Sequence, residues 1–426
     1  MNALTEHLVS QRWFASKARE VSHSSLLDEV ELPGGLRLSL VETTFSTGTH
    51  ETYQLLRSTS EHDAFGEHAE TLLALLREGA EVIGRESTVR FCPFGPIGET
   101  GPSRPMGSDQ SNSTVVFGDE LALKVYRRVE PGINPELEIT RFLTERGFPH
   151  IPALRGWYEI EGPAIEATLG VVQTFVAGAV DGWTLAIDEL GTDAAGFLGR
   201  LRRLGEVIGA MHTALSSDTI DPAFAPEEPS QESVALLTAT IDEEIERLFL
   251  ELGDREATAS IEGRGEEARD RLRLLTQVAV GGRVIRHHGD LHLGQVLLAD
   301  GDWIVLDFEG EPARPLIERR RKRSPLRDVA GMLRSFAYVA SAHALQTGSE
   351  VPDGWEQDAR RAFLDGYHTA VDGSLLPPGQ QATDQLLAVF ELEKAVYELR
   401  YELNNRPDWV RIPVAGIARL LEEPLP

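Results

Sequence analysis

The chain has 426 residues, which exceeds one typical domain, so two or three packed units are expected. Its 41 lysine and arginine residues against 68 aspartate and glutamate residues give a formal net charge of −27. Such a negative field repels nucleic acids and anionic membranes, because binding to either depends on clustered cations. The one basic run, residues 319–323, is better explained as a solvated or phosphate-side loop. We therefore expect no nucleic-acid or membrane partner, and the sequence indicates no obligate protein partner.

The single cysteine, Cys92, cannot form an internal disulfide bond, and no Cys/His cluster suggests structural zinc. Residues 1–7 lack the cationic and apolar segments of a signal peptide, and the sequence has no run of about 18 apolar residues. We therefore expect a soluble protein of the reducing cytoplasm.

The first part of the chain has the pattern of an antiparallel sheet followed by a helix. Residues 29–57 alternate between apolar and polar types in short runs separated by glycine-containing turns. Residues 70–76 have a helical pattern, and the Gly- and Pro-rich residues 93–107 favour neither a helix nor a central strand. We therefore expect a cap subdomain at 1–92 and a linker at 93–107.

A second β-rich region follows the linker. Residues 114–126 contain two β-rich runs joined by Gly118-Asp119, which predicts a hairpin. A short helix should begin at Asn134-Pro135, because proline is favoured in the first turn of a helix. A third β-rich run covers residues 169–176. We assign residues 108–176 to a small lobe.

Residues 177–426 are predominantly helical, except for short strands predicted at 284–285 and 303–306. Strands in the first part and helices in the second predict two lobes. The fold class expected is therefore α+β, with two lobes and an N-terminal α/β cap subdomain.

The loop between the two predicted short strands carries the strongest functional signal. Asp290 lies five positions before Gln295, and a second acid, Asp307, follows 17 positions after Asp290. Phosphoryl transfer requires one carboxylate to orient and deprotonate the attacking hydroxyl, and oxygen ligands to hold Mg²⁺ on the nucleotide phosphates. The spacing predicts a protein-kinase-like, ATP-dependent phosphotransferase with Asp290 as catalytic base and with Gln295 and Asp307 as metal ligands.

Other residues near this loop have alternative interpretations. His288 is expected to brace the loop by hydrogen bonding rather than to act as a base, and His292 either contacts the acceptor or packs the loop. Glu309 is either a further metal ligand or a solvent-facing acid. Ser324 is expected to be the N-cap of a helix, on which Asp328 either orients the catalytic loop or is simply exposed.

The nucleotide site is expected in the small lobe. Lys124, on a β-rich run, is assigned to the α- and β-phosphates, with Glu138 on the next helix as its partner and Glu136 as the less favoured choice. Residues 108–113 precede the hairpin, where a phosphate-covering loop belongs. Three further residues are assigned to the nucleotide: Ser111, Gln173 and Phe175.

Residues 391–402 have the pattern of an amphipathic helix. One stripe of this helix contains Glu391, Lys394, Glu398 and Tyr401. Composition alone is equally compatible with an ordinary surface helix. A polyhydroxylated acceptor, however, needs several fixed polar groups beside an aromatic plane, which Trp409 would supply.

Several stretches spread along nearly the whole chain carry a family resemblance: residues 11–15, 109–112, 123–125, 132–135, 181–183, 288–295, 307–312, 324–328 and 391–397. Together they resemble the bacterial maltokinases, a branch of the aminoglycoside-phosphotransferase-like, protein-kinase-related fold. The resemblance implies an N-terminal cap, a small ATP lobe, a large helical lobe and bound Mg²⁺-ATP. It also implies sugar contacts from the following residues: Asp290, Lys394, Tyr397, Glu398 and Tyr401. Two departures are a region before Ser108 that is shorter than usual and a less basic stretch at 401–405.

The maltokinase-like group also includes actinobacterial kinases that phosphorylate glucosamine. Glu391, Glu393, Glu398 and Glu402 offer carboxylates for an ammonium group, which is how an amino sugar is selected over its neutral analogue. The hypothesis is a glucosamine kinase that makes the 6-phosphate, with a maltose 1-kinase as the alternative. An aminoglycoside phosphotransferase and a nucleotide-binding pseudokinase are more distant alternatives.

Overall fold

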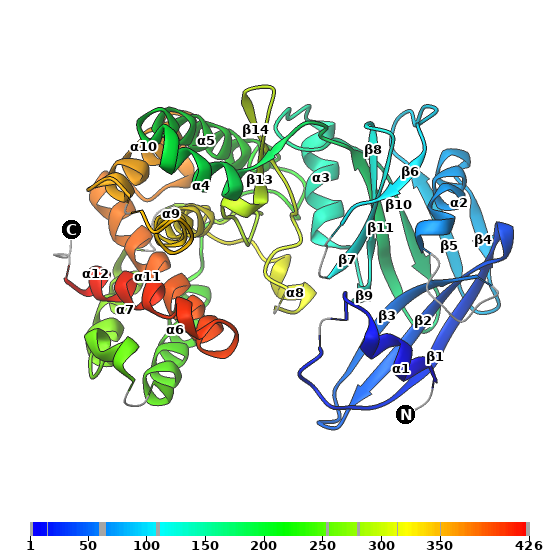
Figure 1. Cartoon of the computed structure of the whole chain (residues 1–426), viewed down its shortest axis with the longest axis horizontal. Helices are drawn as coiled ribbons and strands as arrows, with labels where there is room; N and C mark the ends of the chain where they lie inside the picture. The colour runs from blue at the N-terminus through cyan, green and yellow to red at the C-terminus, as the bar shows by residue number, and fades with distance from the viewer. Residues whose placement is uncertain are drawn as a thin grey trace. The chain divides into compact units, whose positions relative to one another are not determined.

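The chain divides into two compact units, residues 1–178 and 179–426, which Figure 1 shows in one cartoon. The computed structural model describes residues 3–14, 16–58, 65–107, 111–252, 255–278, 282–312, 314–349 and 351–422. Among the described residues, no helix has the length and apolar character needed to cross a membrane.

The first unit begins with a four-stranded antiparallel sheet in the order β1-β2-β3-β9. The bounds of its elements are α1 Ala3–Ser10, β1 Val21–Leu32, η1 Pro33–Gly35, β2 Leu36–Phe45, β3 His50–Arg57 and β9 Arg128–Val129. Trp13 and Phe14 pack against Tyr53 of β3, in a small core that also contains Leu8 of α1. The antiparallel sheet predicted at residues 29–57 is therefore confirmed.

A seven-stranded antiparallel sheet completes the first unit, in the order β4-β5-β10-β11-β8-β7-β6. Its strands are β4 Glu81–Ile83, β5 Thr88–Pro93, β6 Ser103–Pro105, β7 Asn112–Phe117, β8 Leu121–Tyr126, β10 Leu154–Glu161 and β11 Glu166–Thr174. The predicted hairpin is β7–β8, with Phe117 opposite Leu121. Strands β4 and β5, which fall in the predicted cap, pair with this sheet, and β6 from the predicted linker forms its edge.

Helices α2 (Phe65–Glu78) and α3 (Pro135–Glu145) lie on opposite faces of the seven-stranded sheet (Figure 1). Because side chains alternate along a strand, Leu123 and Val125 enter the core with the leucines of α2, whereas Lys124 points towards α3. Helix α3 begins where predicted, since the Asn134 side chain accepts a hydrogen bond of 2.8 Å from the Glu136 N–H.

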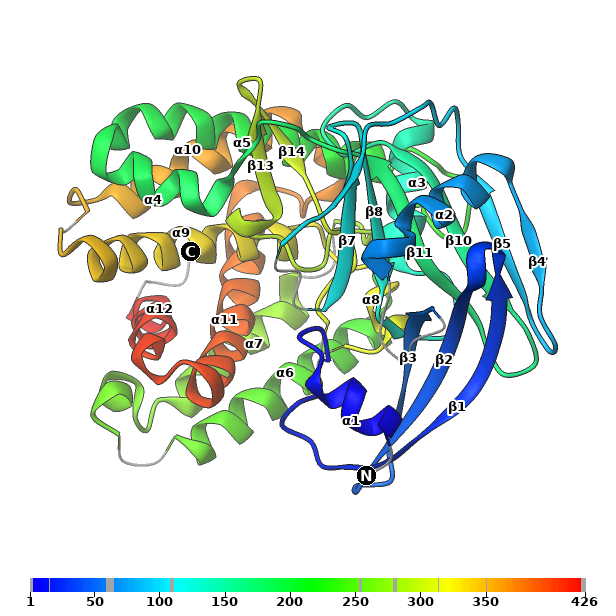
Figure 2. The same cartoon turned by 45° about the vertical axis from the view of Figure 1, so that its right-hand side comes forward.

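The second unit is mainly helical. Its helices are α4 Gly182–Thr192, α5 Ala194–Leu215, α6 Gln231–Glu251, α7 Gly265–Val278, α8 Leu316–Arg319, α9 Leu326–Thr347, α10 Trp355–Ala370, α11 Gln380–Asn405 and α12 Arg411–Glu422. Short 3₁₀ turns lie at η2 Glu256–Ile261, η3 Leu293–Gln295, η4 Gly373–Leu375 and η5 Pro407–Trp409. Its one described sheet has the order β12-β13-β14, with β12 Val180–Asp181, β13 Val296–Ala299 and β14 Asp302–Val305. Helix α11 packs against α9 and also against α6, α7 and α12 (Figure 2).

Two local predictions in this unit need correction. Residues 284 and 285 form isolated bridges to Glu227 and Arg323 rather than a strand. Helix α9 has Pro325 rather than Ser324 as its N-cap, although the Ser324 hydroxyl still accepts a hydrogen bond from the Leu326 N–H at 3.3 Å. Ser324, one residue before the N-cap, therefore satisfies the N–H group of the first helical residue, Leu326.

Candidate active site

A short hairpin brings the two predicted metal ligands together. Strands β13 and β14 are antiparallel and pair Val296 with Val305, so the residues just outside them are also neighbours. The Leu306 N–H donates to the Gln295 carbonyl at 2.9 Å, and the Gln295 side-chain amide lies 3.2 Å from the Asp307 carboxylate. Two side chains separated in sequence by the whole hairpin therefore present their oxygen-bearing groups at one place.

Asp307 has a left-handed backbone, with φ of 61°. This conformation is uncommon for a residue other than glycine and costs free energy. Such strain is typical of positions where a side chain must be held in one direction. The conformation is consistent with a ligating role for Asp307.

Asp328, on the first turn of α9, fixes the backbone of the loop that carries Asp290, which we call the catalytic loop. Its carboxylate accepts hydrogen bonds from the N–H groups of His288 at 2.7 Å and Gly289 at 2.9 Å. A third contact, 3.1 Å, is made with Nε2 of the buried His212. Burial would raise the pKa of Asp328, but the nearby histidines, including the one that binds it through Nε2, hold that pKa well below its usual range. Of the two interpretations of Asp328, loop orientation is therefore the correct one.

Two glycines allow the loop to approach its neighbours. Gly289 has φ of +86°, a region that L side chains rarely adopt. On α9, a Cβ atom at Gly331 would lie 2.5 Å from the Leu291 carbonyl oxygen. Helix α9 can therefore contact the backbone of the loop at Leu291 directly. This contact helps to set the position of Asp290, which lies between Gly289 and Leu291 in sequence.

His288 braces the loop, as expected. Its ring Nε2 donates to the Leu306 carbonyl at 2.7 Å, and Nδ1 accepts from the Asp290 N–H at 3.3 Å. Both ring nitrogens are used in binding the backbone. His292 is also occupied locally, because its Nδ1 accepts from the Gly294 N–H at 3.1 Å. Burial lowers the pKa of His292.

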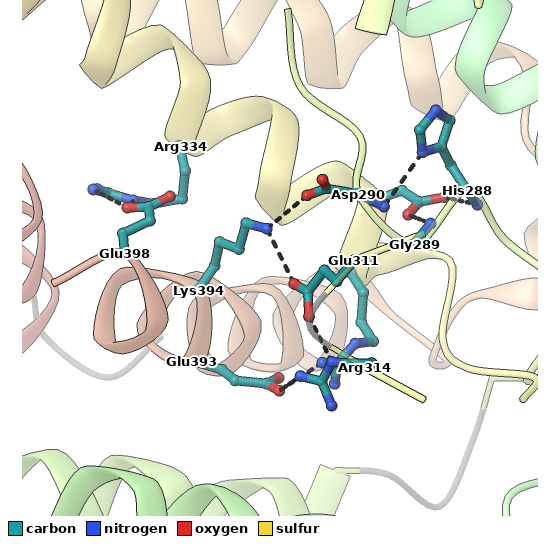
Figure 3. A network of polar contacts seen from close by, with 11 residues as sticks. His288, Gly289, Asp290, Glu311, Arg314, Arg334, Glu393, Lys394 and Glu398 are labelled. Carbon is teal, nitrogen blue, oxygen red and sulfur yellow. Dashed lines mark hydrogen bonds and ion pairs between the residues drawn. The ribbon is translucent and has the colours of Figure 1, made fainter. Parts of the chain in front are cut away.

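The Asp290 carboxylate is held by a lysine from α11 (Figure 3). Lys394 Nζ lies 3.1 Å from Asp290 Oδ1 and 3.1 Å from Glu311 Oε1. Burial would lower the pKa of Lys394, but the two carboxylates raise it above its usual value. Burial likewise would raise the pKa of Glu311, but Lys394 and Arg314 lower it to about 2. Lys394 therefore carries a positive charge between two acids.

These residues line an open cavity with an empty volume of about 750 Å³, a value that includes space open to solvent. Helix α11 contributes Phe390, Glu393, Lys394 and Tyr397, and α6 contributes Glu244. The loop contributes Asp290 and Gly289. The Arg314 guanidinium lies 2.5 Å from Glu311, and Arg327 lies 2.5 Å from Glu393. The cavity thus offers hydrogen-bonding groups and an aromatic ring, which suits a small polyhydroxylated acceptor.

The acceptor residues predicted on α11 do not all face this cavity. Lys394 and Tyr397 line it. Glu391 points into the helix packing, where its two oxygens lie 2.7 and 2.8 Å from the Arg360 guanidinium of α10. Glu391 is therefore not part of the lining of this cavity, and a sugar contact by Glu391 stays a prediction.

Three other predicted acceptor residues are not among the residues that line the cavity. Glu398 lies 2.8 Å from the buried Arg334. Figure 3 shows the contact between these two side chains. Tyr401 is exposed, and the Trp409 ring stacks on Tyr338 with 6.2 Å between the ring centroids. A sugar contact by Glu398, Tyr401 or Trp409 stays a prediction.

The predicted nucleotide residues lie in the first unit. Lys124 Nζ is 2.8 Å from Oε2 of Glu136, the residue that we ranked below Glu138 as its partner. Glu138 is buried on the same helix. The Gln173 amide lies 3.4 Å from the other oxygen of Glu136.

Ser111 is exposed just before β7, and the Arg104 guanidinium lies 5.4 Å from the centre of the Phe175 ring. Residues 108–110, which make up half of the predicted phosphate-covering loop, lie outside the described residues. Nucleotide contacts by Lys124, Glu138, Ser111, Gln173 and Phe175 stay predictions.

Sequence reasoning missed Glu311, Arg314 and Glu244 as parts of the cavity. Glu311 follows the metal motif by four positions and belongs to a stretch that carried the family resemblance. Its proximity to Asp307 in sequence was therefore a usable signal. Glu244 has no such signal, because α6 reaches the cavity only through the helix packing.

Residues 103–347 match the phosphotransferase enzyme family, which is more than half of the chain. The chain belongs to this family. Residues 7–83 match the maltokinase N-terminal cap domain. The α+β fold with an N-terminal cap and the maltokinase-like resemblance, both expected from the sequence, are thereby confirmed.

Curated relatives of the chain include two glucosamine kinases. The one from Streptacidiphilus jiangxiensis is 29% identical over 383 residues, which cover 85% of this chain and 82% of the relative. The one from Mycolicibacterium smegmatis (strain ATCC 700084 / mc(2)155) is 30% identical over 338 residues, which cover 75% of this chain and 80% of the relative.

Solved structures of glucosamine kinase have the same fold. One crystal form has a TM-score of 0.76 at 22% identity, covering 99% of this chain and 100% of that one. A complex of glucosamine kinase with glucosamine, ADP and inorganic phosphate has a TM-score of 0.73 at 23% identity, covering 99% of both chains. At this level of identity the likeness establishes the fold.

Proposed function

We propose that the chain is an ATP-dependent sugar kinase that transfers the γ-phosphoryl group to the 6-hydroxyl of glucosamine. The observation that carries the proposal is Asp290, which lines the cavity and is held by Lys394 at 3.1 Å. The similarity to curated glucosamine kinases over most of the chain supports the choice of sugar.

In the reaction, Asp290 aligns the acceptor hydroxyl and takes its proton while the hydroxyl oxygen bonds to the γ-phosphorus. The bond between the γ-phosphorus and the oxygen of the leaving ADP breaks. Lys394 keeps the Asp290 carboxylate in one orientation, and Asp328 keeps the loop backbone in place through two N–H groups. Holding both reactants in line is the larger part of catalysis in phosphoryl transfer.

Gln295 and Asp307 fit a magnesium site. Mg²⁺ prefers oxygen ligands, and the two side chains approach within 3.2 Å of each other. A rotation of the Gln295 amide by 180° exchanges its nitrogen for its oxygen and presents two oxygens to an ion. When bound, Mg²⁺ neutralises charge on the nucleotide phosphates. Glu309 stays open as a further ligand.

Lys124 is proposed to bind the α- and β-phosphates of ATP, with Glu136 fixing the direction of its side chain. Small-molecule substrates are the only partners that the proposal requires. Activity in the cytoplasm stays a prediction from the sequence.

Phosphorylation of maltose at its 1-hydroxyl is a second candidate, because residues 7–83 match the maltokinase cap. Steady-state kinetics with ATP, Mg²⁺ and each of glucosamine, glucose, N-acetylglucosamine and maltose distinguish the two. The proposal predicts the highest kcat/KM for glucosamine, and EDTA should stop the reaction until Mg²⁺ is restored. Turnover confined to maltose would establish the second candidate instead.

A further inference from the structure

The carboxylates that the sequence offered for an ammonium group are already paired with arginines. All four lie on α11, and each has a guanidinium within 2.8 Å. The pairs are Glu391–Arg360, Glu393–Arg327, Glu398–Arg334 and Glu402–Arg406. Because these charges are balanced, an arriving ammonium would have to share or displace an arginine. An acid without an arginine partner is therefore better placed to select an amino sugar.

Glu244 is such an acid. It lies on α6 and lines the same cavity as Asp290 and Lys394. Within the part of the chain that the structure describes, Glu244 makes no hydrogen bond or ion pair. Burial raises the pKa of Glu244 and the neighbouring Glu393 carboxylate raises it further, whereas Arg314 and Arg400 lower it. An ammonium group bound in the cavity would favour the charged form of this carboxylate.

We propose that Glu244 binds the protonated amine of the amino sugar and so selects glucosamine over glucose. The proposal rests on the proposed function and adds a specificity-determining residue to it. A charge-assisted hydrogen bond between carboxylate and ammonium is stronger than a neutral one, and the site loses this bond when a hydroxyl replaces the amine. Glu244 therefore distinguishes two sugars that differ at one carbon.

The test is the ratio of the Ki of glucose, measured as a competitive inhibitor, to the KM of glucosamine. In Glu244→Gln, which keeps the shape but removes the charge, this ratio should fall by about tenfold or more. The change should appear mainly in KM, because the pair is present in both ground and transition states. Glu244→Asp, which keeps the charge, should retain a higher ratio than Glu244→Gln.

Glu243→Gln is the matched control, since Glu243 is the adjacent residue on α6 and pairs with Arg247 on the surface. Its ratio should equal that of the unmodified chain. An unchanged ratio in Glu244→Gln, in a chain that phosphorylates glucosamine, would overturn the role of Glu244 alone. Failure of the unmodified chain to phosphorylate glucosamine would overturn the proposed function instead.

Discussion

The catalytic loop and helix α11 both supply residues to the cavity, but their contacts have different origins. In the loop, His288 and Gln295 bind groups that lie within about twenty positions of sequence, namely Leu306 and Asp307. On α11, Glu398 and Glu391 bind arginines that are further away in sequence, on α9 and α10. Spacing in the sequence therefore predicts the contacts within the loop well. The pattern of a helical stripe does not reveal which of its acids pair with arginines of other helices.

The largest effect on catalysis is expected in the loop, at Asp290. Asp290→Asn should lower kcat by about 100- to 10,000-fold, because it removes the base while keeping the side-chain shape. ATP affinity should change little. Stopped assays with radiolabelled ATP measure kcat, and calorimetry measures ATP binding. Asp353→Asn, a change at an exposed acid, is the control, and normal kcat in Asp290→Asn would refute the assigned role.

An intermediate effect, on stability, is expected at Glu311. Lys394 of α11 contacts both Glu311 and Asp290 of the loop. The pKa of Glu311 in the folded chain is about 2, below its ordinary 4.5, so its contribution to stability is present above pH 4.5. That contribution is lost as the pH falls from 4.5 towards 2. Glu311→Gln should therefore lower the free energy of unfolding by on the order of 3 kcal/mol near neutral pH.

Urea unfolding of both chains between pH 7 and pH 3 measures this difference. The gap between Glu311→Gln and the unmodified chain should narrow at the acidic end of the series. A gap that stays constant across the series would show that the Lys394 contact does not stabilise the Glu311 carboxylate.

The smallest effect on catalysis is expected at Glu391, on the helix side. Glu391→Gln should leave the KM for glucosamine within about twofold, because the side chain points at Arg360 rather than into the cavity. It should nevertheless lower the thermal midpoint by a few degrees, since two arginines lose their buried acid partner. A KM that rises tenfold with an unchanged midpoint would restore Glu391 to the acceptor site.

Much of the fold and part of the site could be predicted because the signals are local. Asn134-Pro135 is a favoured pair at a helix start, and Gly118-Asp119 is favoured in the turn of a hairpin. The preference of Lys124 for Glu136 over Glu138 could not be predicted, because both carboxylates lie on the same short helix. The distance from β8 to each of them depends on how α3 packs on the sheet.

The position of Glu244 at the cavity also could not be predicted from the sequence. Its helix has an ordinary amphipathic pattern, and nothing in that pattern marks one exposed-looking acid as different from its neighbours. Only the packing of α6 against α11 places it at the cavity.

The β13–β14 hairpin has a consequence for how this chain tolerates insertions. Gln295 and Asp307 meet because of the pairing register of β13 and β14, in which Val296 lies opposite Val305. Lengthening each strand by one residue at the Asp300-Gly301 tip preserves this register at the base of the hairpin. A single added residue within one strand shifts the alignment and moves one of the two side chains to the other face. Evolution can therefore vary the tip of this hairpin in steps of two residues without separating Gln295 from Asp307.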